Sequence, residues 1–169
     1  VLKHILNSAG IERFPEFQKD MVRLGISLYG VSASGEAESL QSVCSLKTII
    51  LQIRNVPAGD SIGYGRKTYV RRDSKIAVIP IGYADGLDRL LSNGTGEVLA
   101  GGKRCPIVGN ICMDTCMIDV TDTDVKEGDQ VTIFNGELTV NEMAGKIGTI
   151  PYEILTSISP RVKRIYFRE

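Results

Sequence analysis

The chain has 169 residues, of which 43% are hydrophobic and 24% are charged, and its 20 Lys and Arg balance its 20 Asp and Glu. This length and composition allow one domain with a buried core and exclude a disordered chain. The zero net charge argues against a nucleic-acid-binding surface, because such surfaces carry a surplus of basic residues.

Neither a membrane span nor a metal site is expected. The longest apolar run, residues 76–81, contains Pro80 and is far shorter than a membrane span. The first residues lack the layout of a signal peptide. Because the sequence begins with Val1 rather than Met, we expect it to be a piece of a longer chain. His4 is the only histidine and no CxxC pair is present, which argues against zinc. The four cysteines are expected to be buried free thiols of a cytoplasmic protein.

The first 35 residues alternate short apolar runs with turns. They predict, in chain order, a strand at 1–6, a turn at 7–10, a short helix ending before Phe14, a strand at 20–26 and a linker at 32–36. Arg23 lies inside the second predicted strand, which we expect to be buried. A buried guanidinium is costly without a partner, so Arg23 is expected to have one, such as a salt bridge.

After the linker the pattern changes to strands separated by glycine-rich turns. Strands are predicted at 43–54, 75–81, 97–100 and 103–108 (a hairpin), 110–120, 130–134 and 161–167. The capping-box pattern from Thr139 to Glu142 predicts a helix that ends at Gly148, and Pro151 predicts the start of a second helix over residues 151–158. Many short strands joined by glycine turns predict a closed or sandwiched sheet.

Residues 61–67 read Ser-Ile-Gly-Tyr-Gly-Arg-Lys and place Tyr64 between two glycines. Glycine lacks a Cβ, so the backbone on both sides of Tyr64 can turn sharply and another molecule can come close. Arg66 and Lys67 supply positive charge that favours the phenolate form of a tyrosine, which suits a general base. Taken alone, the same pattern also fits a glycine-rich turn with an exposed ring.

Six separate stretches point to a known family. In chain order they are residues 4–9 (HILNSA), 21–26 (MVRLGI), 62–65 (IGYG), 82–86 (GYADG), 109–114 (GNICMD) and 152–155 (YEIL). In this order they resemble alanine racemase, an enzyme that uses pyridoxal 5'-phosphate. The resemblance implies a mainly β fold: an alanine-racemase-like C-terminal β-barrel domain over residues 36–169, preceded at residues 1–35 by the last strands of a (β/α)8 barrel of the TIM type.

The resemblance also implies an activity. The family interconverts L- and D-alanine by removing the α-proton from one face and returning it on the other, with a tyrosine and a lysine as the two bases. Tyr64 matches the tyrosine, whereas the family's lysine, which binds the cofactor covalently, lies upstream of this chain. Met113 and Tyr83 match residues that line the substrate site or the route to it, and Arg89 and Asp114 match supporting positions. The residues alone leave open a core position for Met113 and solvated loops for Tyr83 and Arg89.

For the phosphate of the cofactor, the resemblance implies the Ser8 hydroxyl, the amides of Gly25 and Ile26, and the Tyr152 hydroxyl. Barrel enzymes often bind phosphate in the loops after their last two strands, which agrees with this set. The residue types alone also allow a helix N-cap for Ser8 and a surface ring for Tyr152.

Arg23 matches the residue that faces the pyridine nitrogen of the cofactor, and His4 matches a residue that supports it. A guanidinium does not give up its proton, so the resemblance implies an unprotonated nitrogen and suppressed side reactions such as transamination. Asn110 departs from the pattern, because many family members carry Arg there, and this leaves the charge of the entry channel open.

The family works as a homodimer in which the tyrosine and the Met region enter the active site of the opposite subunit. The resemblance therefore implies that Tyr64 and Arg23 serve different active sites, that alanine is the substrate and that the D-alanine made is used for peptidoglycan. Without the lysine, this chain is expected to be inactive by itself. Two alternatives stay open, namely a non-catalytic β-domain that serves as an interaction module and a related pyridoxal-phosphate decarboxylase.

Overall fold

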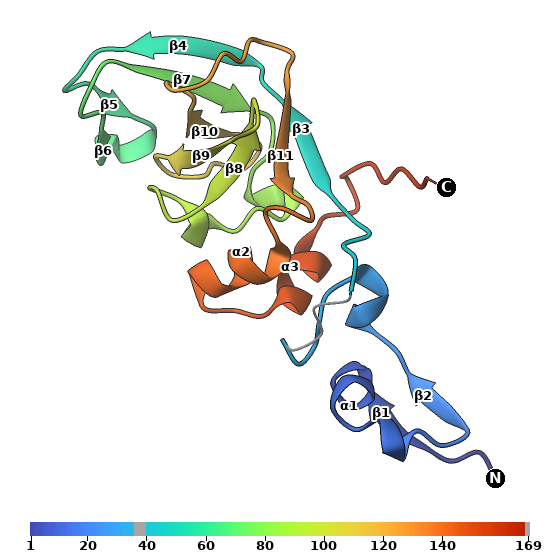
Figure 1. Cartoon of the computed structure of the whole chain (residues 1–169). Coiled ribbons are helices and arrows are strands. Elements are labelled where there is room, and N and C mark those ends of the chain that lie inside the picture. The colour runs from blue at the N-terminus through green and yellow to red at the C-terminus, as the bar shows by residue number, and fades with distance from the viewer. Residues whose placement is uncertain (36–39, 168–169) are drawn as a thin grey trace. The chain divides into compact units, whose positions relative to one another are not determined.

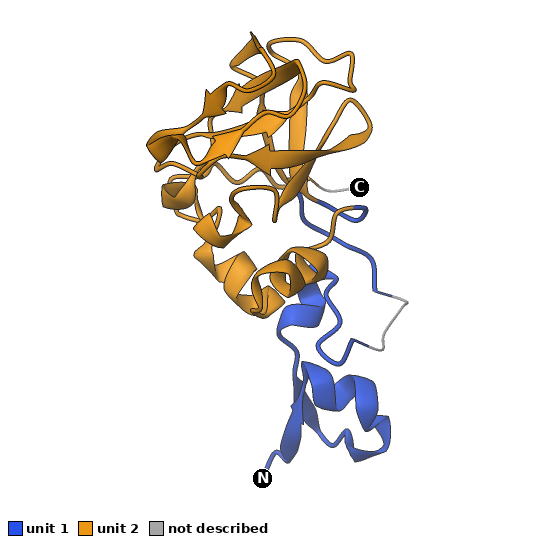
Figure 2. Ribbon diagram, turned by 90° about the vertical axis from the view of Figure 1, so that its left-hand side faces the viewer, with its two compact units in different colours: residues 1–45, 135–137 blue, residues 46–134, 138–169 orange. Residues whose placement is uncertain are grey.

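The computed structural model describes residues 1–35 and 40–167, which form two compact units. The first unit comprises residues 1–45 and 135–137, and the second comprises residues 46–134 and 138–169 (Figure 2). Glu36, the last residue of the predicted linker and the first of the predicted β-domain, lies outside the described residues. None of the helices within the described ranges combines the length and the apolar character that crossing a membrane requires.

The first unit contains a small β-α-β arrangement. Strand β1 (His4–Asn7) leads into helix α1 (Ser8–Arg13), and β2 (Met21–Arg23) then pairs with β1 in parallel (Figure 1). Two 3-10 helices, Pro15–Phe17 and Ile26–Tyr29, complete it. A parallel pair requires a crossover between its strands, and α1 with the first 3-10 helix supplies it here.

Two predictions for this unit are wrong. The predicted turn at 7–10 is largely helical, because the Asn7 side chain accepts a hydrogen bond from the Gly10 amide and caps α1. The predicted burial of Arg23 fails because alternation along β2 turns Val22 partly inward and leaves Met21 and Arg23 exposed.

The carboxylate of Glu12 holds the segment that follows the second 3-10 helix. It accepts hydrogen bonds from the hydroxyls of Ser27 (2.9 Å) and Ser32 (2.8 Å), the amide of Ala33 (3.1 Å), and the amide (2.9 Å) and hydroxyl (2.6 Å) of Ser34. Desolvation raises the pKa of Glu12, but the bonds from Ser34, Ala33 and Ser32 outweigh it and lower the pKa from 4.5 to about 2.

Because folding lowers the pKa of Glu12, its stabilisation is complete above pH 4.5 and is lost as the pH falls towards about 2. We expect Glu12→Gln to accelerate hydrogen exchange at the Ala33 and Ser34 amides at pH 7, with a loss of ~1–2 kcal/mol after allowance for solvent screening. The difference from the unmodified chain should shrink as the pH approaches 2. Glu16→Gln, at an exposed position in the next 3-10 helix, is the control. Equal exchange in the two variants would contradict the prediction.

The second unit is built on a seven-stranded antiparallel sheet (Figure 1). Its strands are β3 (Leu46–Ile49), β4 (Gln52–Val56), β7 (Ser74–Ile79), β8 (Glu97–Ala100), β9 (Lys103–Val108), β10 (Cys116–Asp119) and β11 (Gln130–Phe134). The spatial order is β3-β11-β8-β9-β10-β7-β4. A separate two-stranded ribbon joins β5 (Ser61–Ile62) to β6 (Thr68–Tyr69).

The sheet curls into a partial barrel because its two edge strands are consecutive in the chain. Only Ile50 and Leu51 separate β3 at one edge from β4 at the other. The Ile50 amide donates to Asp129, just before β11, and the Leu51 amide donates to Val78 of β7. The single strand predicted at 43–54 is therefore two strands that continue round a bend. The predicted closed sheet is confirmed in this form, and the mainly β fold with it.

The inner face of the curled sheet carries the core. Burial alternates along β9 from Cys105 and along β10, as the 2-residue period of a strand requires, whereas β8 and β11 also bury consecutive residues. The fully buried residues of these strands include Val98, Ile107, Ile118, Val131 and Ile133. Such a core holds the loops at the end of the barrel on a rigid base.

Other local predictions for this unit are confirmed. The hairpin of β8 and β9, strands β7 and β11, and helices α2 (Val140–Ile147) and α3 (Pro151–Ser157) lie where they were predicted. Thr139 caps α2 by accepting from the Glu142 amide, and Gly148 ends it in the left-handed conformation.

Two predicted strands fail. The strand predicted at 110–120 is confined to β10, because residues 112 and 113 bond to the 82–84 loop instead of to a neighbouring strand. The strand predicted at 161–167 does not form, because the chain turns from Ser159 to Val162 and the Arg164 guanidinium binds the carbonyls of this turn.

Candidate active site

The loop between β5 and β6 presents Tyr64 to solvent. Gly63 (φ 72°) and Gly65 (φ 77°) adopt the left-handed backbone that glycine accepts without strain. A Cβ on Gly63 would lie 3.0 Å from Cε of Met117, a close contact with the end of a flexible side chain. The Tyr64 side chain is 78% exposed. A ring held in this way can reach a separate molecule.

Arg66, the first of the two cations after Tyr64, is hydrogen-bonded within the loop. Arg66 also has a positive φ, 49°, and its Nε donates to Oγ of Ser61 at 2.9 Å, which ties the two ends of the loop together. The guanidinium thus makes a hydrogen bond within the loop, although Arg66 is exposed.

Segment 109–115 connects the loops that carry the predicted catalytic and substrate residues. The Asn110 amide group donates to the carbonyl of Tyr64 at 3.1 Å. The carbonyls of Cys112 and Met113 each accept at 3.0 Å from the backbone amides of Tyr83 and Ala84. Met113 and Tyr83 are 53% and 44% exposed, so neither is a core residue. The structure therefore ties Tyr64, Met113 and Tyr83, each on its own segment, into one hydrogen-bonded set.

Gly82 allows the close approach of these segments. A Cβ at this residue would lie 2.3 Å from the carbonyl oxygen of Cys112 and 2.4 Å from that of Met113. Real Cβ contacts are not this short, so the two backbones can meet only at a glycine.

Arg161 lies next to the candidate site. Nothing in the sequence indicated this, because Arg161 was predicted only as the first residue of a strand. Its guanidinium donates at 2.7 Å both to Asp85, in the loop of Tyr83, and to Asp114, beside Met113. These bonds raise the pKa of Arg161 above its already high ordinary value, the Asp85 bond contributing first and the Asp114 bond second. Asp114 is thus paired with Arg161.

In the first unit, the structure brings together part of the predicted phosphate set. The Gly25 amide donates to Oγ of Ser8 at 2.9 Å, and the Ser8 side chain is buried. A Cβ on Gly25 would meet only that Oγ, at 3.6 Å. Ile26 follows directly and begins a 3-10 helix. Ser8 does not cap α1, since Asn7 does so.

The remaining predicted residues are placed as follows. Arg23 donates to the carbonyl of Ile5 on β1 at 3.1 Å, and His4 lies on the same strand, opposite Met21. Tyr152 is the second residue of α3 in the second unit and is 43% exposed. Arg89 is exposed at the start of the 3-10 helix Arg89–Leu91.

The four cysteines are free thiols. Cys105 and Cys116 are buried, and burial raises the pKa of the Cys116 thiol to about 12, which keeps it protonated and unreactive. Cys44 and Cys112 are half-buried. Within residues 1–35 and 40–167, no three His, Cys, Asp or Glu side chains are grouped to hold a metal ion.

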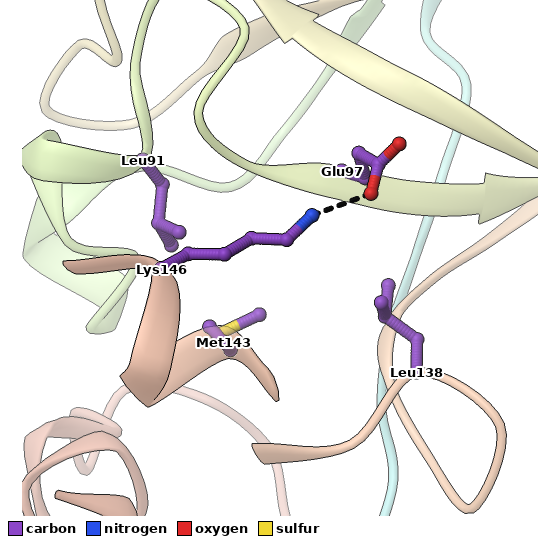
Figure 3. Close-up of a pocket in the computed structure, with 5 residues that line it drawn as sticks. All are labelled: Leu91, Glu97, Leu138, Met143 and Lys146. Carbon is purple, nitrogen blue, oxygen red and sulfur yellow. Dashed lines mark hydrogen bonds and ion pairs between the residues drawn. The ribbon is translucent and has the colours of Figure 1, made fainter. Parts of the chain in front are cut away.

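A small cavity lies beside helix α2 and is not a cofactor site. Figure 3 shows Lys146 crossing it to an ion pair with Glu97 at 2.5 Å. The other lining residues are Leu91, Leu138 and Met143. The cavity volume is about 10 Å³, which is room for about one water molecule.

Comparison with known proteins agrees with this architecture. Residues 43–166 match the family model described as alanine racemase, C-terminal domain. The chain is 49% identical over 173 residues to alanine racemase 2 of Caldanaerobacter subterraneus and 45% identical over 174 residues to the alanine racemase of Methanococcus maripaludis. Each match covers 98% of this chain but only 44% and 46% of these relatives, so the chain spans about half of their length.

Solved structures give the same result. The alanine racemase of Bartonella henselae with covalently bound pyridoxal phosphate superposes with a TM-score of 0.92 at 41% identity, over 98% of this chain and 47% of that one. The Clostridium difficile alanine racemase in complex with cycloserine gives a TM-score of 0.87 at 42% identity, over 95% and 44%. The chain belongs to the alanine racemase family, and its residues 43–166 match the C-terminal domain of that family.

Proposed function

We propose that this chain is the C-terminal part of a pyridoxal-phosphate-dependent alanine racemase that interconverts L- and D-alanine. The observation that carries the proposal is the 49% identity to a curated alanine racemase over 98% of the chain. The six motifs of the sequence, including those around Ser8, Tyr64 and Met113, also occur in the order expected of the family, which chance similarity of one short motif does not produce.

Tyr64 is the proposed base that exchanges a proton with the α-carbon of alanine. Its exposure and its place between two left-handed glycines suit a phenol that must reach a substrate held by another part of the enzyme. The second base is a lysine from the rest of the protein. The backbone amide of Met113 is the proposed donor to the substrate carboxylate, since a Met side chain cannot donate, and Tyr83 lines the approach with Arg89.

The residues of the first unit suit a pyridoxal phosphate group. A phosphate needs hydroxyl and amide donors, and the Ser8 hydroxyl lies 2.9 Å from the Gly25 amide, with Ile26 next in the chain. Tyr152 is the proposed fourth phosphate ligand. Arg23, supported by His4, is proposed to face the pyridine nitrogen. When bound, the cofactor withdraws electrons from the α-carbon, which makes the α-proton easier to remove.

We further propose that the enzyme is a homodimer, with Tyr64 and Arg23 of one chain in two different active sites. Residues 1–35 would be the end of the barrel that binds the cofactor, and residues 36–169 the β-domain. Free thiols at Cys105 and Cys116 support a reducing, cytoplasmic location. D-Alanine from the reaction would supply peptidoglycan synthesis.

The test is an assay of the full-length polypeptide that contains this chain, purified with pyridoxal phosphate. L-Alanine should be converted to an equal mixture of the enantiomers, measured by chiral chromatography, without release of carbon dioxide. This chain alone, with added cofactor, should give no turnover. Racemisation by the chain alone at the full-length rate would contradict the need for an upstream lysine, and carbon dioxide release would identify a decarboxylase instead.

A further inference from the structure

Three polar side chains link both ends of the Tyr64 loop to segment 109–115. The Thr68 hydroxyl donates to Oδ1 of Asn93 at 2.8 Å, Nδ2 of Asn93 donates to Oδ1 of Asn110 at 3.1 Å, and Nδ2 of Asn110 donates to the carbonyl of Tyr64 at 3.1 Å. We propose that this Asn110 relay (Thr68, Asn93 and Asn110) positions Tyr64 for proton transfer. The proposal rests on the function proposed above for Tyr64. It gives a role to Asn110, which departs from the family pattern, and to Thr68 and Asn93, which lie outside the six motifs.

The hydrogen bonds of the relay run in one direction. The last acceptor is a backbone carbonyl, which cannot donate, so Asn110 must turn its Nδ2 towards Tyr64 and its Oδ1 towards Asn93. Asn93 must then offer Nδ2 to Asn110 and Oδ1 to the Thr68 hydroxyl. If either amide flipped, two acceptors or two donors would face each other. Successive bonds of this kind polarise one another, so both Asn side chains are held in single orientations.

The relay is anchored in the rigid part of the barrel. The backbone N–H of Asn93 donates to the carbonyl of Gly109 at 2.9 Å. The backbone N–H of Gly94 donates to the carbonyl of Ile107, a fully buried residue of β9, at 2.7 Å. Next to Asn110, the Ile111 amide donates to the hydroxyl of buried Ser92 at 3.0 Å. A displacement of the relay would therefore break several backbone bonds together.

Backbone strain in the second unit coincides with the relay. Among the described residues, Arg66 (φ 49°) and Asn93 (φ 57°) are the two non-glycine residues with positive φ. The first lies in the Tyr64 loop, and the second is the middle member of the relay. For Arg66, such a conformation persists only where surrounding contacts impose it, whereas Asn adopts it more readily. With Gly63 and Gly65 beside Tyr64, the loop has little backbone stiffness of its own, so the relay adds to the Arg66–Ser61 bond in holding it.

The first test needs no enzymatic activity. Asn110→Leu removes both bonds of Asn110 at similar size and without charge, whereas Asn110→Asp keeps an acceptor for Asn93 and removes the donor to Tyr64. Hydrogen exchange of this chain, followed in peptides covering residues 61–69, should be faster in both variants. Asn141→Leu, at an exposed position of α2, is the control and should leave these peptides unchanged. Unchanged exchange in the Asn110 variants would overturn the relay as a positioning device.

The second test is kinetic and uses the full-length racemase. Both Asn110 variants should lower kcat by ~10- to 100-fold, because a small displacement of a base costs about this much, with KM for alanine changed less than threefold. The isotope effect with α-deuterated alanine should increase, since proton transfer becomes slower, while the urea midpoint stays near that of Asn141→Leu. Losses of kcat/KM must be equal in the two directions, because the enantiomers have equal energies.

The outcomes separate the two proposals. Full activity in the variants, or a loss explained by a lower urea midpoint, would overturn the relay and leave the racemase function intact. A full-length protein without racemase activity would overturn the function of Tyr64, whereas the exchange data would still decide whether the relay holds the loop.

Discussion

Replacing Tyr64 by Phe in the full-length racemase is expected to lower kcat in both directions by ~10²- to 10⁴-fold, the range for loss of a general base. The hydroxyl is the only group removed, and in the part of the chain that the structure describes it makes no hydrogen bond. The loop takes its shape from Gly63, Gly65 and the carbonyl of Tyr64, which the substitution leaves in place. KM for alanine and the urea midpoint should therefore change little.

The matched control for this substitution is Tyr69→Phe. Tyr69 is also exposed and lies on β6, five residues further along the chain, so the same hydroxyl is lost from the same surface. Its kcat should stay within twofold of the unmodified enzyme. Retention of more than a tenth of the activity by Tyr64→Phe, with Tyr69→Phe unaffected, would show that Tyr64 is not the base.

Replacing Gly82 by Ala is expected to destabilise the second unit by ~3 kcal/mol, the upper end of the range for an overpacked site. The added methyl would lie 2.3 Å from the oxygen of Cys112 and 2.4 Å from that of Met113, and both are backbone atoms that cannot rotate away. Separation of the segments would also break the bonds donated by the Tyr83 and Ala84 amides. A urea titration of this chain measures the loss.

Gly145→Ala is the matched control for Gly82→Ala. Gly145 lies within α2, and an added Cβ would meet nothing within 4 Å. The same methyl should therefore stabilise the helix, by ~0.5–1 kcal/mol, because alanine loses less backbone entropy than glycine. Opposite signs for the two substitutions are the expected result. A Gly82→Ala chain as stable as the unmodified one would show that the two loops can separate at little cost.

The local elements that the sequence predicted correctly are those whose signals lie within a few residues. Thr139 and Gly148 bound helix α2 because a side-chain acceptor and a left-handed glycine act on the nearest backbone groups. Gly101 and Gly102 turn the β8–β9 hairpin for the same kind of reason, since both adopt positive φ. The family motifs were also readable, because each is a short run of residues.

Segment 109–115 shows where local reading failed. Its apolar residues predicted a strand, but a strand requires a partner, and its carbonyls instead meet the 82–84 loop at a distance that only Gly82 permits. The prediction of one strand over residues 43–54 failed for a different reason. The alternation of its side chains is correct, but the bend at Ile50 appears only when the sheet curls round. Hydrogen-bond partners far apart in the chain decided both cases.

The amino-acid sequence by itself determined the family, the positions of helices α2 and α3 and of the β8–β9 hairpin, and Tyr64 as the residue presented between glycines. Only the tertiary structure decided that Arg161 joins Asp85 to Asp114 and that Asn93 and Asn110 hold the carbonyl of Tyr64. The physical reason is that caps and turns act over a few residues, whereas these bonds join segments 17 to 76 residues apart. Such pairs depend on the register of the curled sheet, which no local pattern encodes.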